Sequence, residues 1–142
     1  MTPETIARLD ELFASMPVLL GGARSREEVD DAQERVGVRF DPDYREFLVR
    51  YGGGIVGSLP ILGVSRAEAM SKDEWSVVAV TARFRADGWT PTERWVVVSV
   101  DLAGNPVGVD SEGTVWISDH DAGEVRVVAT TFEGFIVQLL DE

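Results

Sequence analysis

The 142-residue sequence has no cysteine, a single histidine and no long apolar run. The absence of cysteine excludes a disulfide framework and any metal site built on thiolates. No apolar segment approaches the roughly 18 residues that a membrane-spanning helix requires. The first residues, Met1 to Glu4, include an acid and no basic region, so they do not resemble a secretory signal. These absences lead us to expect a protein of the cytoplasm without a membrane segment.

Basic residues are also scarce, because 13 lysines and arginines stand against 25 aspartates and glutamates, for a net charge of −12. The imbalance is greatest after residue 94, where nine acids accompany one base, Arg126. Such a surface repels phosphate backbones and disfavours nucleic acid as a direct partner, whereas it attracts a basic protein. Acidity of this kind can also serve solubility alone.

What remains is the composition of an ordinary globular protein. Apolar residues make up 44% and charged residues 27%, which argues against general disorder. A chain of this length can bury a stable apolar core without disulfides or structural metal ions. We therefore expect a single domain over residues 1–142.

Two helices are predicted before residue 40. The first runs from about Pro3 to Met16, with Thr2 as its cap and proline in its first turn. Ser25 and Glu28 have the spacing of a capping box, which begins the second helix, and Gly37 ends it.

A third helix is predicted in the stretch D-P-D-Y-R-E-F-L-V-R-Y-G-G-G, Asp41 to Gly54. Asp41 can cap it, and Pro42 suits its first position. Its apolar face, spaced i, i+3, i+4 and i+7, consists of Tyr44, Phe47, Leu48 and Tyr51. Gly52 can close the helix in the left-handed conformation. Three glycines could also suggest a phosphate cradle or a catalytic loop, but they follow a helix and no Gly-Lys-Ser/Thr accompanies them. We therefore favour a structural role for the three glycines over a phosphate-binding or catalytic one.

The rest of the chain is predicted to form a helix, a meander and a closing helix. Ser71 to Arg85 is interpreted as a helix, because Asp73 and Glu74 suit a first turn, although part of it has strand-like content. Trp95–Val100 is apolar on both faces, as expected of a central strand. Thr131 caps the last helix. Turn residues about nine positions apart separate three further antiparallel strands, at Pro106–Val109, Thr114–Ser118 and Val125–Ala129. This order predicts an α+β fold, with about four to five helices packed on a mostly antiparallel sheet.

Candidate catalytic and metal-binding groups are weak. His120 lies between Asp119 and Asp121, which could hold an imidazole base, but no Gly-x-Ser-x-Gly elbow accompanies it, and a solvated turn histidine is favoured. No pair of carboxylates is singled out for glycoside hydrolysis. Oxygen ligands could come from Asp101, Asn105 and Asp110 or from Asp119, Asp121 and Glu124, but neither set has the spacing of a calcium loop. We expect no catalytic residue, no metal and no cofactor.

Packing is the default role of the four tryptophans. Trp89 is the exception that we single out, because it follows Gly88 and precedes Thr90-Pro91 at the end of a predicted helix. It is the tryptophan that we expect to be most exposed and therefore the best candidate for an interface anchor.

The Asp41–Gly54 block resembles the signature of the SUKH superfamily, which reads roughly L-P-x-x-Y-x-x-F-L-x-x-x-N-G-G. The segment Trp95–Asn105 is similar to the core strand and glycine-rich turn of that family, and Val115–Asp121 is similar to its late strand and turn. The chain departs from the pattern at four places. Phe40-Asp41 stands where leucine is usual and Tyr51-Gly52 where asparagine is common, and Asn105-Pro106 and Asp121 replace the usual glycine-rich turn and glutamate. The residues that carry the resemblance in structural roles are Pro42, Tyr44, Phe47, Leu48, Gly52, Gly53 and Gly104.

The resemblance implies a binding module rather than an enzyme. Many bacterial members are immunity proteins that neutralise a secreted toxin, often a nuclease, by direct contact, and a fungal cell-wall regulator in the superfamily is an interaction hub. An inhibitor of a nuclease gains from acidic turns, because the basic active site of a nuclease binds phosphate.

We therefore expect an immunity-type protein that binds a cognate toxin or another basic protein. The partner-binding residues that we expect are Trp89 and the acids of the meander turns, Asp110, Glu112, Asp119, Asp121 and Glu124. A general regulatory scaffold is the alternative function, and an acid-dependent hydrolase that uses His120 or Asp119 is a third.

Overall fold

The computed structural model covers residues 1–142 and confirms the α+β class, with five α-helices and two antiparallel sheets. In chain order the elements are α1 (Pro3–Ser15), η1 (Pro17–Leu19), α2 (Arg26–Val36), α3 (Pro42–Tyr51), β1 (Gly54–Val56), β2 (Leu59–Ile61), α4 (Val77–Ala86), η2 (Thr90–Arg94), β3 (Val96–Val100), β4 (Pro106–Val109), β5 (Val115–Asp119), β6 (Glu124–Ala129) and α5 (Phe132–Leu140), where η1 and η2 are 3₁₀ helices.

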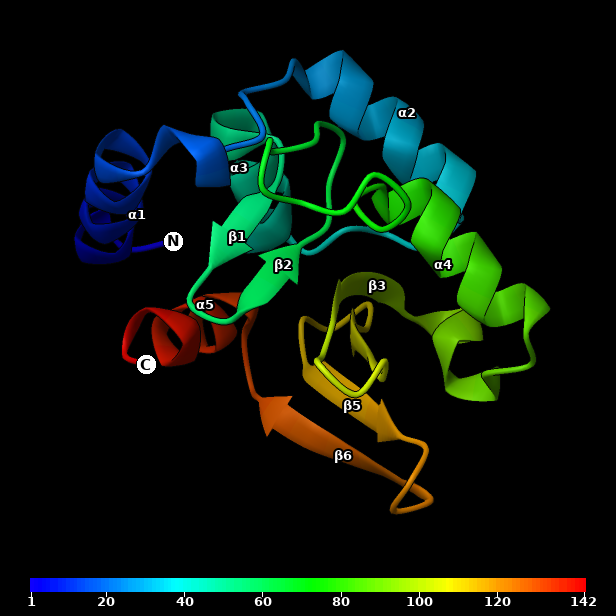
Figure 1. Ribbon diagram of the computed structural model, residues 1–142. Coiled ribbons are helices and arrows are strands. Elements are labelled where there is room, and N and C mark those ends of the chain that lie inside the picture. The colour runs from blue at the N-terminus through cyan, green and yellow to red at the C-terminus, as the bar shows by residue number, and fades with distance from the viewer.

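The two sheets differ in size and position. Strands β1 and β2 form a small hairpin, and the larger sheet has the order β3-β4-β5-β6, which confirms the predicted meander. Figure 1 shows the helices and the small hairpin above the larger sheet, with β6 at its outer margin. A single cluster of 31 buried apolar residues, drawn from all five helices and both sheets, forms the core.

The predicted apolar face of α3 lies at the centre of this core. Tyr44, Phe47 and Leu48 are fully buried, and the Tyr44 hydroxyl donates to the carbonyl oxygen of Leu62 at 2.6 Å. The Tyr44 ring also meets Phe132 of α5 edge-on, at 5.2 Å between ring centroids. The Asp41–Gly54 block therefore serves the core, as we expected, and Gly52 closes α3 at φ +73°.

The predicted helix starts are confirmed in four cases. Thr2, Asp41 and Thr131 accept backbone N–H groups at the starts of α1, α3 and α5, and Ser25 and Glu28 form the complete capping box of α2. A cap needs only a side chain and a backbone N–H two or three residues apart, so a sequence pattern identifies it well.

The predicted start of α4 is wrong by six residues. The helix begins at Val77, with Ser76 as its cap, and not at Ser71. Gly63 explains the difference, because its N–H donates to Trp75 O at 2.9 Å and its carbonyl accepts from Val77 N–H at 3.0 Å. This parallel bridge holds the preceding residues out of the helix.

The expectation that Trp95–Val100 forms a central strand is also wrong. All five residues of β3 are buried, as predicted, but β3 is the first strand of the sheet and not an inner one. Helix α4 and strand β2 pack along its free side and bury it. Burial on both faces therefore comes from a helix and a hairpin at the edge of the sheet.

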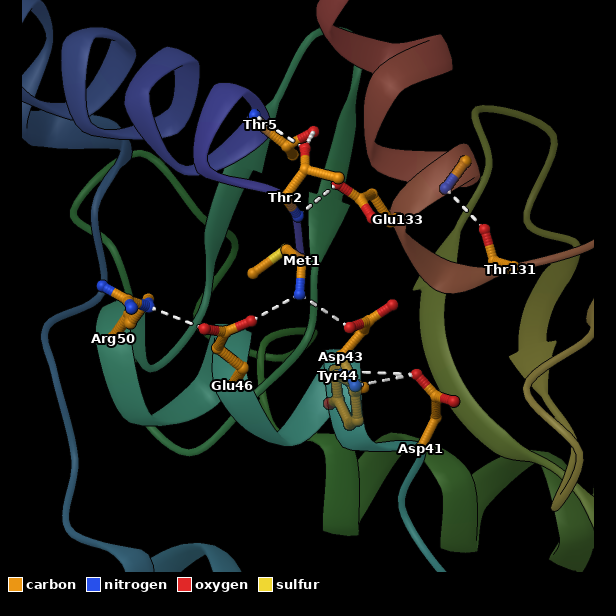
Figure 2. Close-up of polar contacts among 11 residues, drawn as sticks. Met1, Thr2, Thr5, Asp41, Asp43, Tyr44, Glu46, Arg50, Thr131 and Glu133 are labelled. Carbon is orange, nitrogen blue, oxygen red and sulfur yellow. Dashed lines mark hydrogen bonds and ion pairs between the residues drawn. The ribbon is translucent and has the colours of Figure 1, made fainter.

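The amino group of Met1 joins α1 to α3 (Figure 2). It lies 2.8 Å from Asp43 Oδ1 and 2.6 Å from Glu46 Oε1, and the next backbone N–H, of Thr2, donates to Glu133 of α5 at 2.7 Å. Hydrogen bonds to Asp43 and Glu46 raise the pKa of the amine from 8.0 to about 10. The charged amine lowers the pKa of Glu46 in turn.

We expect this contact to make stability fall between pH 8 and pH 10. Because the folded-state pKa lies above the unfolded value, the stabilisation is complete below pH 8 and is lost as the pH rises through about 10. The full pKa difference corresponds to ~2.7 kcal/mol, but Asp43 and Glu46 are 32% and 31% exposed, so solvent screening should leave ~1 kcal/mol.

Urea unfolding across this pH range measures the effect. The control is a chain with Gly-Ser added ahead of Met1, which moves the amine away from Asp43 and Glu46 and should remove the decline. An equal decline in both proteins would contradict the role of the amine.

Candidate protein-binding surface

The turns of the meander lie at opposite ends of the larger sheet. The β3–β4 and β5–β6 turns share one end and the β4–β5 turn lies at the other, because antiparallel strands alternate in direction. Asp121 lies in the β5–β6 turn and Asp119 and Glu124 are the strand residues that flank it, whereas Asp110 and Glu112 belong to the β4–β5 turn. The structure thus divides the five predicted acids into two groups, about 15 Å apart along β5.

The β5–β6 turn with its two flanking strand residues, residues 119–124, is called here the acidic hairpin. Asp119 Oδ1 accepts the N–H of Ala122 at 3.0 Å, and Arg126 Nη1 lies 3.5 Å from Asp119 Oδ2 and 3.2 Å from Glu124 Oε1. The N–H of Ala122, helped by Arg126, holds the pKa of Asp119 below its usual value. Asp121 is exposed and forms no ion pair. One arginine therefore pairs with two of the three carboxylates, and the hairpin keeps a net negative charge.

Trp89 lies beside the acidic hairpin. Its ring meets Phe84 edge-on at 5.3 Å between centroids and lies 5.6 Å from the His120 ring. Trp89, Asp119 and Glu124 line the same groove, of about 380 Å³. The structure therefore brings the predicted anchor together with two of the predicted acids. Trp89 is half-buried, and so it is held more firmly than the exposed side chain that we expected.

His120 contributes its backbone to the fold and leaves its ring exposed. Its N–H donates to Asn105 Oδ1 at 3.0 Å, and buried Asn105 donates through Nδ2 to Asp101 Oδ2 at 3.2 Å. These bonds connect the β3–β4 turn, which contains Gly104 at φ +86°, to the acidic hairpin. No carboxylate bonds the imidazole, so the geometry offers no pair of a base and an orienting acid.

Asp110, at the other end of the sheet, is engaged within its own turn. Its Oδ1 accepts the N–H groups of Glu112 and Thr114 at 2.9 and 3.1 Å, and its Oδ2 accepts the indole N–H of Trp116 at 2.9 Å. Asp110 therefore positions Trp116 and contributes charge, whereas the Glu112 side chain is exposed.

An apolar face, defined by Trp95, Trp116, Val125 and Val127, lies between the two ends of the sheet. Trp95 stacks on Trp116 at 6.4 Å and 14°. Gly108 permits this stacking, because a Cβ atom there would lie 2.6 Å from the Trp95 ring. Val127 pairs with Trp116 and Val125 with Ser118, so both valines share the face, and they are 46% and 45% exposed. Exposure rises from buried Trp95 toward β6.

Sequence reasoning missed this face. The signal that could have found it is the alternation of Val125 and Val127 in the last strand of a meander, because such a strand has one neighbour only. The strand predicted at Val125–Ala129 is present, but the spacing within one segment does not show that it lies at the edge of the sheet.

A groove of about 960 Å³ lies between α2 and α3 and gathers four arginines, Arg26, Arg39, Arg45 and Arg50. Two of them are neutralised within it, since Arg45 pairs with Asp30 and Arg50 with Glu46.

No three histidine, aspartate or glutamate side chains come together anywhere as a candidate metal site. None of the helices combines the length and apolar character needed to cross a bilayer.

The sequence profile of the family described as SMI1-KNR4 cell-wall, SUKH_5, matches residues 3–141, which is nearly the whole chain. No curated protein matches the chain significantly. Membership of this family supports a role in binding proteins, and the family is generally non-catalytic. The chain therefore belongs to the SUKH family, also described as SMI1-KNR4.

Proposed function

We propose that this protein is a cytoplasmic immunity protein that binds a basic toxin, such as a secreted nuclease, and blocks it without catalysis. Family membership supports protein binding in general. The observation that carries the finer proposal is the acidic hairpin beside Trp89, in a chain of net charge −12. A charged rim next to a partly buried aromatic ring is the usual composition of a protein interface.

Each part of this surface has a separate physical role. Asp119, Asp121 and Glu124 attract a cationic surface at long range and accept charge-assisted hydrogen bonds on contact. The Trp89 ring, in the same groove as Asp119 and Glu124, offers a cation–π contact to an arginine or lysine of the partner. Neutralisation then follows from occupation of the basic active site of the toxin.

Neutralising the acidic hairpin should slow association with the toxin. We expect the triple variant Asp119→Asn, Asp121→Asn and Glu124→Gln to associate about tenfold more slowly at low salt, because steering depends on local charge. Asparagine at position 119 keeps an acceptor for Ala122 N–H. Association with toxins encoded beside the gene, measured by biolayer interferometry at two salt concentrations, tests this expectation.

The matched control removes the same charge elsewhere. Glu4, Glu11 and Glu34 are exposed acids of α1 and α2 without an ion pair, and their replacement by glutamine should slow association by less than about threefold. Equal slowing by both triple variants would leave only net charge as the cause and contradict the proposed surface. Binding to none of the neighbouring toxins would overturn the immunity role and favour the regulatory scaffold.

A further inference from the structure

Strand β6 is the free edge of the larger sheet (Figure 1). All four residues from Glu124 to Val127 are exposed. No hydrogen bond from outside the sheet reaches their backbone groups, and the nearest is donated by Gln138 Nε2 to Val128 O at 2.8 Å. In an edge strand, alternate residues present their N–H and C=O groups to solvent. This segment therefore has unpaired backbone groups available for another strand.

The opposite edge of the sheet is closed. At β3, the N–H of Val97 donates to Thr81 Oγ1 of α4 at 3.1 Å, and the carbonyl of Val98 accepts from Leu62 N–H at 2.8 Å. Ser99 Oγ also donates to Pro60 O of β2 at 2.6 Å. The fold thus covers one edge with a helix and a hairpin and leaves the other free.

The free edge carries apolar side chains at alternate positions. Only five large apolar side chains of the protein are exposed, and two of them, Val125 and Val127, lie in this segment. Both lie on the apolar face next to Trp116, whose ring is held by Asp110 and by stacking on Trp95. Every second side chain of an added strand would therefore pack against a rigid apolar surface.

Charge around this edge determines which strand it fits. Asp119, Asp121 and Glu124 lie at one end of β6, and Glu112 lies in the turn near the other end. The one base between them, Arg126, is paired with Asp119 and Glu124. A basic segment complements this edge, whereas a second copy of the chain would bring together two proteins of charge −12.

We propose that β6 binds an extended segment of a basic partner protein by strand addition, with apolar side chains of that segment at alternate positions against Val125 and Val127 and lysine or arginine between them. This proposal rests on the proposed function and specifies how the partner is held. Main-chain hydrogen bonds along β6 supply affinity, and the acids at its ends favour basic sequences.

A synthetic peptide tests the proposal without knowledge of the toxin. The probe is acetyl-Lys-Val-Arg-Val-Thr-Val-Lys-amide, titrated into the ¹⁵N-labelled protein, with amide hydrogen exchange as the readout. We expect saturable, salt-sensitive binding and at least about fivefold slower exchange at alternate amides of residues 124–127. A peptide with glutamate in place of each basic residue, and one with proline in place of the central valine, should bind at least about tenfold more weakly.

A matched pair of protein variants locates the binding site. Val127→Lys places a cation on the edge, whereas Val18→Lys makes the same change at a valine of η1 with nearly the same exposure, 45% against 46%. We expect Val127→Lys to weaken peptide binding by at least about tenfold and Val18→Lys by less than about twofold. Thermal unfolding should show that both variants fold.

Three outcomes of the peptide experiments would overturn the proposal. They are no peptide binding at about 1 mM, binding without protection of residues 124–127, and equal effects of the two lysine variants. Dimerisation of the protein alone through β6, visible by analytical ultracentrifugation, would assign the edge to a second copy instead. If no toxin encoded beside the gene binds the protein, the proposed function fails but the peptide result stands. If a toxin binds Val127→Lys as well as it binds the unchanged protein, strand addition is refuted but the immunity role stands.

Discussion

Replacing Gly52 by alanine should destabilise the protein by about 3–5 kcal/mol, and we expect this to be among the largest effects of any single methyl group in the chain. Gly52 closes α3 at φ +73°, where an L-residue costs roughly 1–2 kcal/mol. The larger part of the cost comes from its neighbours, because an added Cβ atom would overlap the carbonyl oxygen of Gly22 and the hydroxyl of Ser65.

Hydrogen bonds hold these neighbours in place. Ser65 Oγ donates to Gly22 O at 2.6 Å, Gly22 N–H donates to Tyr51 O at 2.7 Å, and the carbonyl of Gly52 accepts from the N–H groups of Val64 and Ser65. The end of α3 is therefore enclosed between two loops that cannot withdraw without loss of these bonds.

Gly37 provides the matched control. It closes α2 at φ +78°, but no atom lies within 4 Å of an added Cβ. Gly37→Ala should therefore cost only about 1 kcal/mol, through backbone strain. Urea unfolding of both variants measures the difference, and equal costs would show that Gly52 serves the left-handed conformation alone.

Arg85 is the second position where we expect a large effect. Its guanidinium donates to three backbone carbonyls, of Val36 at the end of α2, Thr92 in η2 and Trp95 before β3, at 2.6 to 3.1 Å. Burial lowers the pKa of Arg85, which indicates that its charge is partly removed from water. One side chain thus joins the end of α2, 49 residues earlier in the chain, to the η2 segment that leads into β3.

We expect Arg85→Met to destabilise the protein by about 3 kcal/mol, because the aliphatic stem is kept but the carbonyls of Val36 and Trp95 lose their charged donor. Arg83→Met, two residues earlier on the same helix, should cost less than about 1 kcal/mol, since Arg83 is exposed and its contacts are an ion pair with Glu74 and a cation–π contact with the Phe84 ring. Chemical unfolding at neutral pH compares the two variants. Similar losses would mean that the three carbonyl contacts contribute little.

Four of the five helix starts, and the turns, were predictable because their causes are local. Thr2, Ser25, Asp41 and Thr131 each bond a backbone N–H two or three residues away, so the relevant distance is set by chain geometry alone. The apolar face of α3 follows from helical spacing for the same reason.

Errors arose where a distant segment competes for the same backbone groups. The start of α4 depends on Gly63, twelve residues before Trp75, and the sealed edge of β3 depends on Thr81 and Leu62. Neither partner has a sequence signal that links it to the other, because any segment with free N–H and C=O groups can make these bonds.

The candidate surface shows the same division between local and distant causes. The acids of the meander turns were predictable as turn residues, since aspartate and glycine suit tight turns. Strand direction then separated Asp110 and Glu112 from the acidic hairpin, and helix packing brought Trp89 to the hairpin and left β6 uncovered.

The amino-acid sequence by itself determined the helix caps, the meander, the family and the excess of negative charge, because each depends on residue identity or on spacing within a few positions. Tertiary structure alone decided which acids stand together, which tryptophan faces them and which edge of the sheet remains free. The physical reason is that these last features depend on contacts between segments tens of residues apart, whose formation is governed by the packing of the whole core.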